Sequence, residues 1–465
     1  MKKKFDIIII GNGSIASSIA FEIINKEKKL KIAIIGPKDR EGSATSAAGL
    51  MLNVFGEIEY DSLSSIQGRR KFEMLLASRK LWANHVKSLN NQSKIKLKIK
   101  KGTVVLNNSS SDDLDDENFS SIVAGLKKYN ESFEFIKNSK IKGYKPYERN
   151  RSLQSIFIPN ENSISSNALM NSYDYIFENK KNVNIFNSYI TKINIKKDNL
   201  KEITDNNGKK YLSENIILAS GAYTQNLINQ LKKIKNKIPK IFYGSGVAFL
   251  ASKEKLVAPE FVVRTPNRGL ACGLHVVPLG TNNLYVGATN RVSHIPINYP
   301  IISSITGLQN SFVKEFNSDH HNMRIKKIFI GHRPTSLDSF PLIGPTSIKG
   351  LWIASGTKRD GITISPLIGK AIANMVLNKK ELLISKDFFP ERKPLFVMTK
   401  KEGIKKAVKH IFSAAYQHQL EFPMANWKEP IEEMFYKDIE NIYKKSKLKV
   451  GVPPEILNMY KYKRV

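Results

Sequence analysis

Two short apolar runs, far apart in the chain, end in the same way. Residues 5–10 run into Gly11-Asn12-Gly13, and residues 351–355 run into Gly356. Each run is nearly continuous, which predicts a strand buried on both faces, and the glycine predicts a tight turn into a helix. A helix that begins there directs backbone N–H groups and the positive end of its dipole outward. Two such turns predict a long ligand held at both ends.

The first run belongs to a larger unit. Residues 14–26 carry Ile15, Ile19 and Ile23 at helical spacing, and residues 31–35 form a second apolar run. A strand, a helix and a strand within about thirty residues predict the βαβ unit of a dinucleotide-binding fold. FAD is the candidate for the long ligand.

Further elements follow from periodicity and turn residues. We expect helices at 62–89 and 164–178, a strand at 183–195, a hairpin around 198–208 and a buried strand at 216–222. Residues 107–118 are rich in Ser, Asn and Asp, which predicts an exposed loop.

Four short runs in the middle of the chain predict a mostly antiparallel sheet, at 240–250, 259–265, 272–278 and 284–288. Residues 324–332 are expected to lead back to the parallel sheet. The predicted fold is α/β and α+β, with a discontinuous Rossmann-like FAD-binding domain (1–89, 151–228 and 325–385), an antiparallel-sheet substrate domain (90–150 and 229–324) and a helical, basic C-terminal extension (386–465).

The composition permits an ordinary folded protein. The 465 residues are 41% hydrophobic and 25% charged, enough for two or more domains with normal cores. The net charge of +33 indicates either a nucleic-acid or anionic-membrane partner, or a codon bias toward Lys, Ile, Asn and Ser. The even spread of lysines favours the second interpretation, and the charge still favours anionic substrates.

Targeting signals are weak. Met1-Lys2-Lys3-Lys4 and the isoleucines that follow mimic a signal peptide, but Asp6 interrupts a run that is too short. No apolar run approaches membrane-spanning length. A single cysteine, Cys272, excludes an intramolecular disulfide, so we expect a cytoplasmic protein.

Six segments, in order, resemble the D-amino-acid oxidase family of FAD-dependent oxidoreductases, particularly its glycine oxidase and sarcosine oxidase branch. They are GNGSIA, SATSAAGLM, IILASGAYT, HVVP with YVGATNR, GHRPTSLDSFPLIG and LWIASGTKRDGITISPLIGKAIA. The resemblance covers about residues 5–380 and leaves out the last 80 or so.

The resemblance implies which residues bind FAD. Those expected at the pyrophosphate are Gly11, Gly13, Ser14, Ile15, Ala16 and Gly221. Those expected along the ribityl chain and isoalloxazine are Thr45, Ser46, Ala48, Gly49 and Met51. Those expected to place N–H groups near the flavin N1–C2=O edge are Gly356, Gly361, Ile362 and Thr363.

Arg333 is the candidate substrate residue. In family members that act on amino acids, the arginine of the matching G-x-R-P segment pairs with the substrate carboxylate. A planar guanidinium can clamp a carboxylate through two charge-assisted hydrogen bonds. The alternative is an arginine that ties a loop to the domain. Arg359, beside the second turn, is another candidate, with a surface ion pair as its alternative.

The sequence departs from the family pattern at three places. The second strand ends at Gly36 rather than at the usual ribose-binding acid, so Asp39 or Glu41 substitutes or the ribose is held otherwise. A basic residue there also suggests NADP, which the C-terminal flavin motif argues against. His275 stands where this branch often has Tyr. It either binds substrate, accepts a proton, or packs with hydrogen bonds and points away from the pocket. Cys272 is in the wrong segment for covalent flavin attachment, so FAD is expected to be noncovalent.

The resemblance implies an enzyme that oxidises the C–N bond of an amino acid or amine by hydride transfer to flavin N5, with O2 or another acceptor taking the electrons. Arg333 and His275 are its candidate catalytic residues. One alternative is a flavin-dependent tRNA wobble-uridine modification enzyme, which the charge favours and the lack of a methyltransferase domain disfavours. Another is a non-catalytic flavin-fold binding module.

The extension at 386–465 carries many aromatic residues, which predicts a packed surface more than a free tail. It is expected to cover the substrate domain, form a homo-oligomer interface or bind an acidic partner. His320 and His321 are adjacent without further ligands in pattern, so no metal site is predicted.

Overall fold

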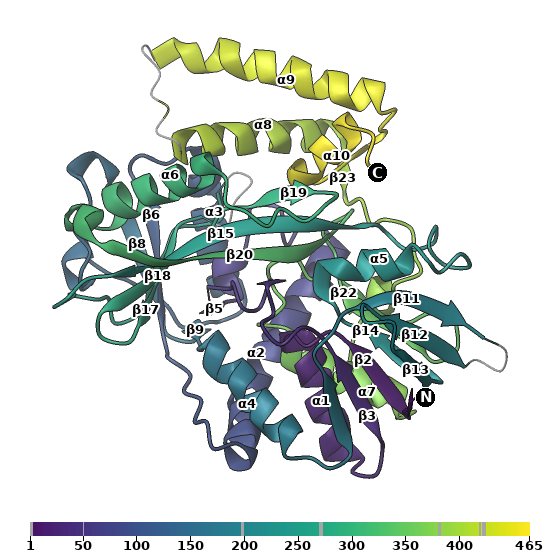
Figure 1. Ribbon diagram of the computed structural model, residues 1–465. Coiled ribbons are helices and arrows are strands. Elements are labelled where there is room, and N and C mark those ends of the chain that lie inside the picture. Colours follow the sequence, from purple (N-terminus) through teal and green to yellow (C-terminus); the bar gives the residue numbers. More distant parts are fainter. Residues whose placement is uncertain are drawn as a thin grey trace.

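The computed structural model describes residues 3–49, 51–196, 200–268, 273–379, 383–417, 420 and 425–465. Cys272 and the residues 198–199 of the predicted hairpin lie outside this part of the chain. Two large sheets form the body, and helices of the C-terminal extension lie across the second sheet (Figure 1). Within the described residues, no helix combines the length and the apolar character needed to cross a membrane.

Both glycine turns leave the same sheet. Its six strands are ordered β10 (Val183–Phe186), β3 (Ile32–Ile35), β2 (Ile7–Ile10), β14 (Asn215–Leu218), β22 (Leu351–Ser355) and β21 (Leu342–Pro345). All pairs are parallel except β21 with β22. Because β2 and β22 are separated only by β14, the turns that follow them lie at the same edge, where parallel strands bind ligands.

Helices cover this sheet. Helix α1 (Ser14–Lys26) packs on α7 (Ser365–Val376), so the helices that begin at the two turns are neighbours. Helices α2 (Ile66–Gln92) and α4 (Ser166–Glu178) belong to the same layer and share its apolar core. The predicted helix at 164–178 and the isoleucine strands are confirmed. Smaller elements complete the region: β1 (Lys3–Lys4), β5 (Met51–Leu52), β9 (Asn162–Ser163), β11 (Ile190–Ile195), β12 (Lys201–Asp205), β13 (Lys210–Ser213) and α5 (Thr224–Ile228).

The second sheet is mostly antiparallel, as predicted. Its main path is β4 (Gly42–Ser43), β20 (Arg324–Ser336), β15 (Ile241–Ser252), β18 (Asn283–Gly287), β17 (His275–Leu279), β16 (Val262–Arg264), β6 (Thr103–Asn108), β8 (Ser152–Ile158) and β7 (Glu134–Phe135), with β19 (Arg291–Ser293) on β15. Helix α6 (Ile302–Ser311) packs against β15.

Two strands of this sheet differ from expectation. β20 pairs with β15 along its length, whereas residues 324–332 were expected to lead back to the parallel sheet. β8 pairs with β6, although the boundary at 151 assigned it to the FAD-binding domain. Both strands join this sheet by pairing with strands that lie far away in the chain, and no local pattern identifies such partners. The division into domains stays a prediction.

The exposed loop expected at 107–118 is wrong for its second half. Helix α3 (Asp113–Lys128) begins there and buries Leu114, Phe119, Ile122 and Leu126. Its first turn holds Asp113, Asp115 and Asp116, and carboxylates at a helix N-terminus are favourable partners of the helix dipole. The polar residues that predicted a loop therefore form the N-terminal turn of a helix.

The extension folds onto the body. It contains β23 (Met398–Thr399), α8 (Lys400–Gln417), α9 (Lys428–Lys445), β24 (Val450–Gly451), a 3-10 turn (Pro454–Ile456) and α10 (Leu457–Lys461). Helices α8, α9 and α10 share an apolar cluster that includes Ile404, Phe412 and Tyr443. The helical, packed extension that the sequence predicts is present.

Candidate functional site

A cavity of about 670 Å³ lies between the two sheets. Both glycine turns line it, at residues 11–15 and 357–363, and so do the small residues of 42–49. The opposite wall comes from β15, β17 and β20. The site is a single space that both turns and the antiparallel sheet share, which is the arrangement a long ligand held at both ends requires.

The first turn presents the uncapped N-terminus of helix α1 to the cavity. Gly11 has a φ of +119°, and a Cβ there would lie 2.3 Å from the Ala219 carbonyl oxygen. Helix α1 begins at Gly13 without a side-chain cap, so its first N–H groups are not all satisfied by the helix. The Ser14 N–H donates to Thr45 Oγ1 at 3.1 Å, which ties the turn to the small-residue segment. This cradle fits a pyrophosphate.

The second turn is fixed by helix α2. The carbonyl oxygen of Thr363 accepts hydrogen bonds from Ser78 Oγ at 2.8 Å and Trp82 Nε1 at 3.0 Å. Gly356 has a φ of +72°, and α7 follows with Pro366 in its first turn. Helix α7 begins directly after the cavity-lining residues 361–363. The positive end of its dipole therefore lies beside the cavity. These features fit an electron-rich ring edge.

Most predicted FAD residues line the cavity. They are Gly11, Gly13, Ser14, Ile15, Thr45, Ala48, Gly49, Met51, Gly221, Gly361, Ile362 and Thr363. Three do not. Ala16 is fully buried in α1, Ser46 Oγ donates to the Arg40 and Ser43 carbonyls, and Gly356 lies in the turn behind the wall. Contact of each residue with FAD stays a prediction.

Arg333 lies in the cavity wall with an unneutralised charge. Its Nη1 donates to the Thr289 carbonyl at 3.0 Å and approaches Asn290 Oδ1 at 3.4 Å. The guanidinium lies over Gly246, where a Cβ would come within 2.2 Å of Nη1. Within the described chain, no ion pair includes Arg333. Its remaining donors are available to an anion.

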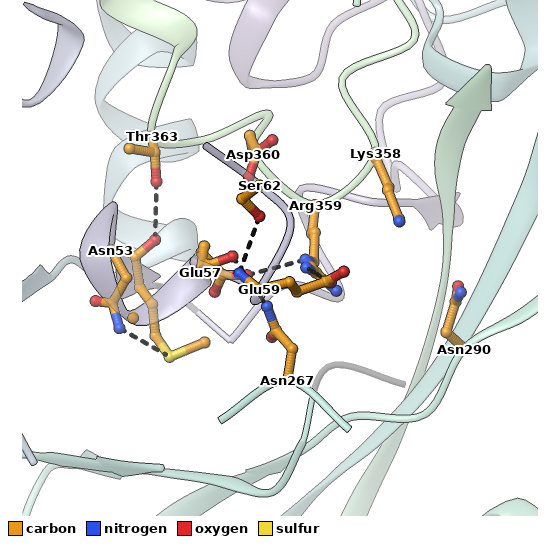
Figure 2. A network of polar contacts seen from close by, with 12 residues as sticks. Asn53, Glu57, Glu59, Ser62, Asn267, Asn290, Lys358, Arg359, Asp360 and Thr363 are labelled. Carbon is orange, nitrogen blue, oxygen red and sulfur yellow. Dashed lines mark hydrogen bonds and ion pairs between the residues drawn. The ribbon is translucent and has the colours of Figure 1, made fainter. Parts of the chain in front are cut away.

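Arg359 also lines the cavity but is already paired. Its Nε lies 2.9 Å from Glu57 Oε2, and its Nη2 lies 2.5 Å from Glu59 Oε1 (Figure 2). Glu57 in turn contacts the fully buried Arg264 at 2.5 Å. Burial alone would raise the pKa of Glu57, but Arg264 and Arg359 lower it to about 2. Two guanidinium groups and two carboxylates therefore form one charged cluster in the wall.

His275 is buried at the cavity wall and neutral. Its ring stacks on Tyr285 with centroids 5.8 Å apart, and its Nδ1 has no hydrogen-bond partner. A Cβ on Gly49 would lie 2.5 Å from Nε2, so only glycine leaves room for this imidazole. Burial, with smaller effects from Arg264 and Arg333, lowers the pKa of His275 to about 3. His275 is among the residues that line the cavity, and its role in binding substrate stays a prediction.

At the end of β3, Arg40 lines the cavity but is engaged, whereas Lys38 is exposed and does not line it. Arg40 pairs with Asp174, its Nη1 2.9 Å from Oδ2, and its Nε donates to the Asn12 carbonyl at 2.9 Å. A Cβ on Gly36 would collide with the Asn12 side chain, whose Nδ2 donates to the Pro37 carbonyl. Asp39 and Glu41 line the cavity. They remain the candidates for the ribose.

Sequence reasoning missed Glu57 and Glu161. Glu161 is fully buried and accepts the N–H groups of Val54, Phe55 and Gly56 at 2.9 to 3.3 Å. It thereby fixes the loop that carries Glu57. No local signal marks either residue, because each is an isolated acid whose partners lie elsewhere. Within the described part, no three His, Cys, Asp or Glu side chains are placed to hold a metal ion.

Known proteins are similar to this chain over most of its length. Residues 6–375 match the family model described as FAD dependent oxidoreductase (DAO). The chain is 23% identical over 391 residues to a glycine oxidase of Geobacillus kaustophilus (strain HTA426), covering 82% of this chain and 95% of the relative. A crystal structure of glycine oxidase from Geobacillus kaustophilus has a TM-score of 0.70 at 18% identity, covering 84% of this chain and all of that one. Iminodiacetate oxidase from Chelativorans sp. BNC1 has a TM-score of 0.68 at 16% identity, covering 83% and 98%.

Proposed function

The chain belongs to the FAD dependent oxidoreductase (DAO) family, and we propose that it oxidises the C–N bond of an amino acid or a related amine that carries a carboxylate. The observation that carries this proposal is Arg333, a cation in the cavity wall without an acidic partner among the described residues. The relatives named glycine oxidase and iminodiacetate oxidase support the substrate class.

The residues of both turns would hold FAD. Those of 11–15 fit the pyrophosphate, and those of 361–363 fit the flavin edge. When bound, FAD supplies the acceptor for a hydride from the C–H next to nitrogen, and water hydrolyses the imine that remains. We expect noncovalent FAD.

The chain's own residues would bind and orient the substrate. Arg333 holds the carboxylate, while Thr289 and Asn290 hold one side of the guanidinium and fix its direction. Orientation of a carboxylate-anchored substrate supplies much of the rate enhancement. A neutral amine would need no strong base, which agrees with a wall whose other charges are largely paired.

The test is anaerobic mixing of the FAD-loaded protein with a panel of primary and secondary amino acids. Loss of the flavin absorption band is expected with at least one of them. If no amino acid or related amine bleaches the flavin, the proposed substrate class is wrong. Repeating the active pair with O2 and with an artificial acceptor separates an oxidase from a dehydrogenase.

His275 gives a prediction for the pH dependence. Because its folded pKa is about 3 and the unfolded value is near 6.5, the imidazole is neutral in the folded protein above about pH 5. The folded state therefore loses stability as pH falls below about 6.5, where the unfolded chain takes up the proton. The pH profile of kcat/KM between 5 and 9 is expected to keep the same apparent pKa values in H275N. Disappearance of an acid limb in H275N would contradict this neutral assignment.

A further inference from the structure

The C-terminal extension reaches the cavity wall through charged contacts. Lys406 of α8 lies 3.2 Å from Glu59 and 2.7 Å from Asp61, and Glu59 holds Arg359. Glu455, in the 3-10 turn before α10, pairs with Lys358 and accepts from Ser339 Oγ at 3.0 Å. Lys358 and Arg359 both line the cavity. Two separate elements of the extension therefore reach adjacent residues of the second glycine turn, Lys358 directly and Arg359 through Glu59.

These contacts are shielded from water. The side chains of Lys406 and Glu455 are 10% and 8% exposed. Burial would lower the pKa of Lys406, but Glu59 and Asp61 raise it, and Lys358 lowers the pKa of Glu455 to about 2 against the effect of burial. Each charge is therefore set by its partner across the interface, and charges in such a site interact more strongly than on a surface.

The extension is also held firmly on the sheet that carries Arg333. Ile456 and Met459 pack with Phe242, Val292 and Leu337 of the β15–β20 region. Farther along, Lys428 lies 2.9 Å from Asp112, at the start of α3. In Figure 1 helix α8 runs along the side of the ten-stranded sheet, with α9 outside it. Because the extension is anchored at these contacts, it can hold the second glycine turn in a fixed position.

We propose that the extension positions the side of the cavity formed by Lys358 and Arg359, and that this side affects anion binding. Lys406 and Glu455 are its positioning residues. Lys406 pairs with Glu59 and Asp61. Arg359 is shared between Glu57 and Glu59 (Figure 2). Glu455 holds Lys358 and offsets its charge. The family match ends at residue 375, so both residues lie beyond the matched segment. The inference rests on the proposed function for the identity of the anion.

Two substitutions test it because they change the local charge in opposite directions. Lys406→Met leaves Glu59 and Asp61 in excess beside Arg359, so anions should bind on the order of tenfold more weakly. Glu455→Gln leaves Lys358 without its carboxylate, so anions should bind several-fold more tightly. Variants that only loosened the fold would weaken binding in both cases.

The probes are sulfite, which binds reversibly at the flavin ring, and acetate. Their dissociation constants are read from changes in flavin absorption of the FAD-loaded full-length protein. Lys406→Arg should restore wild-type affinity, and Lys405→Met, exposed on the same helix, is the matched control. FAD content and thermal midpoints are measured in parallel.

Opposite shifts for Lys406→Met and Glu455→Gln, with Lys405→Met unchanged, support the inference. Affinities within twofold of wild type in both variants overturn it, as does a wild-type protein that binds neither anion. If Lys406→Met does not fold, the direction of the Glu455→Gln shift decides. Anion shifts without reduction by any amino acid would remove the proposed function and leave the positioning role.

Discussion

Replacing Arg333 by methionine is expected to lower kcat/KM for the best amino-acid substrate by about 10³-fold, because each hydrogen bond to a charged group contributes about 1.5–3 kcal/mol and a carboxylate clamp uses two. FAD binding should be unchanged, since the guanidinium contacts Thr289 and Asn290 on the sheet. Most of the loss should appear in KM if the carboxylate is held equally in ground and transition states.

The measurement is steady-state kinetics together with FAD content of the purified variants. Arg333→Lys keeps the positive charge but lacks the planar guanidinium. Its kcat/KM should lie between those of the wild type and Arg333→Met. Arg291→Met, an exposed arginine on β19, is the control. A folded, FAD-loaded Arg333→Met enzyme that retains a tenth or more of wild-type kcat/KM would show that the carboxylate is bound elsewhere.

Replacing Gly11 by alanine is expected to abolish FAD retention during purification and to destabilise the fold by about 3–5 kcal/mol. The added Cβ would lie 2.3 Å from a backbone oxygen of the neighbouring chain segment at Ala219, and alanine disfavours a φ of +119°. Relief requires the ends of β2 and β14 to separate, and this movement displaces the donors that face the pyrophosphate.

Gly208→Ala is the matched control, because Gly208 also has a positive φ, +76°, but no atom within 4 Å of the added Cβ. It should cost about 1 kcal/mol and leave FAD bound. Thermal unfolding and the ratio of flavin to protein absorption measure both effects. Equal losses of stability in the two variants would mean that backbone conformation, and not the collision at Ala219, decides the role of Gly11.

Some errors of the sequence prediction have a common physical cause. Residues 113–118 were assigned to a loop because Asp and Ser are frequent, yet carboxylates also suit a helix N-terminus when apolar residues follow at helical spacing. Residues 324–332 were expected only to lead back toward the parallel domain, and their pairing with β15 was not predicted because β15 lies about 80 residues earlier in the chain. Local sequence patterns predict whether a segment is a helix or a strand better than they predict which other elements it contacts.

The sequence by itself was enough to identify the family of this protein and its cofactor. The strand, glycine and helix signals at both ends, with six motifs in order, identified the family, because a ligand held by backbone atoms constrains residues that are adjacent in the chain. Arg333 became the candidate substrate residue through the G-x-R-P pattern of its own segment, which is also local in the chain.

Only the tertiary structure decided the state of the charges around the cavity. Arg359 is paired because Glu57 and Glu59 reach it from 300 residues away, and Lys406 joins them from a segment outside the family match. His275 is neutral because burial, with nearby cations, removes its proton. Charge and protonation depend on what surrounds a side chain in space, and for these residues almost all of that comes from distant parts of the chain.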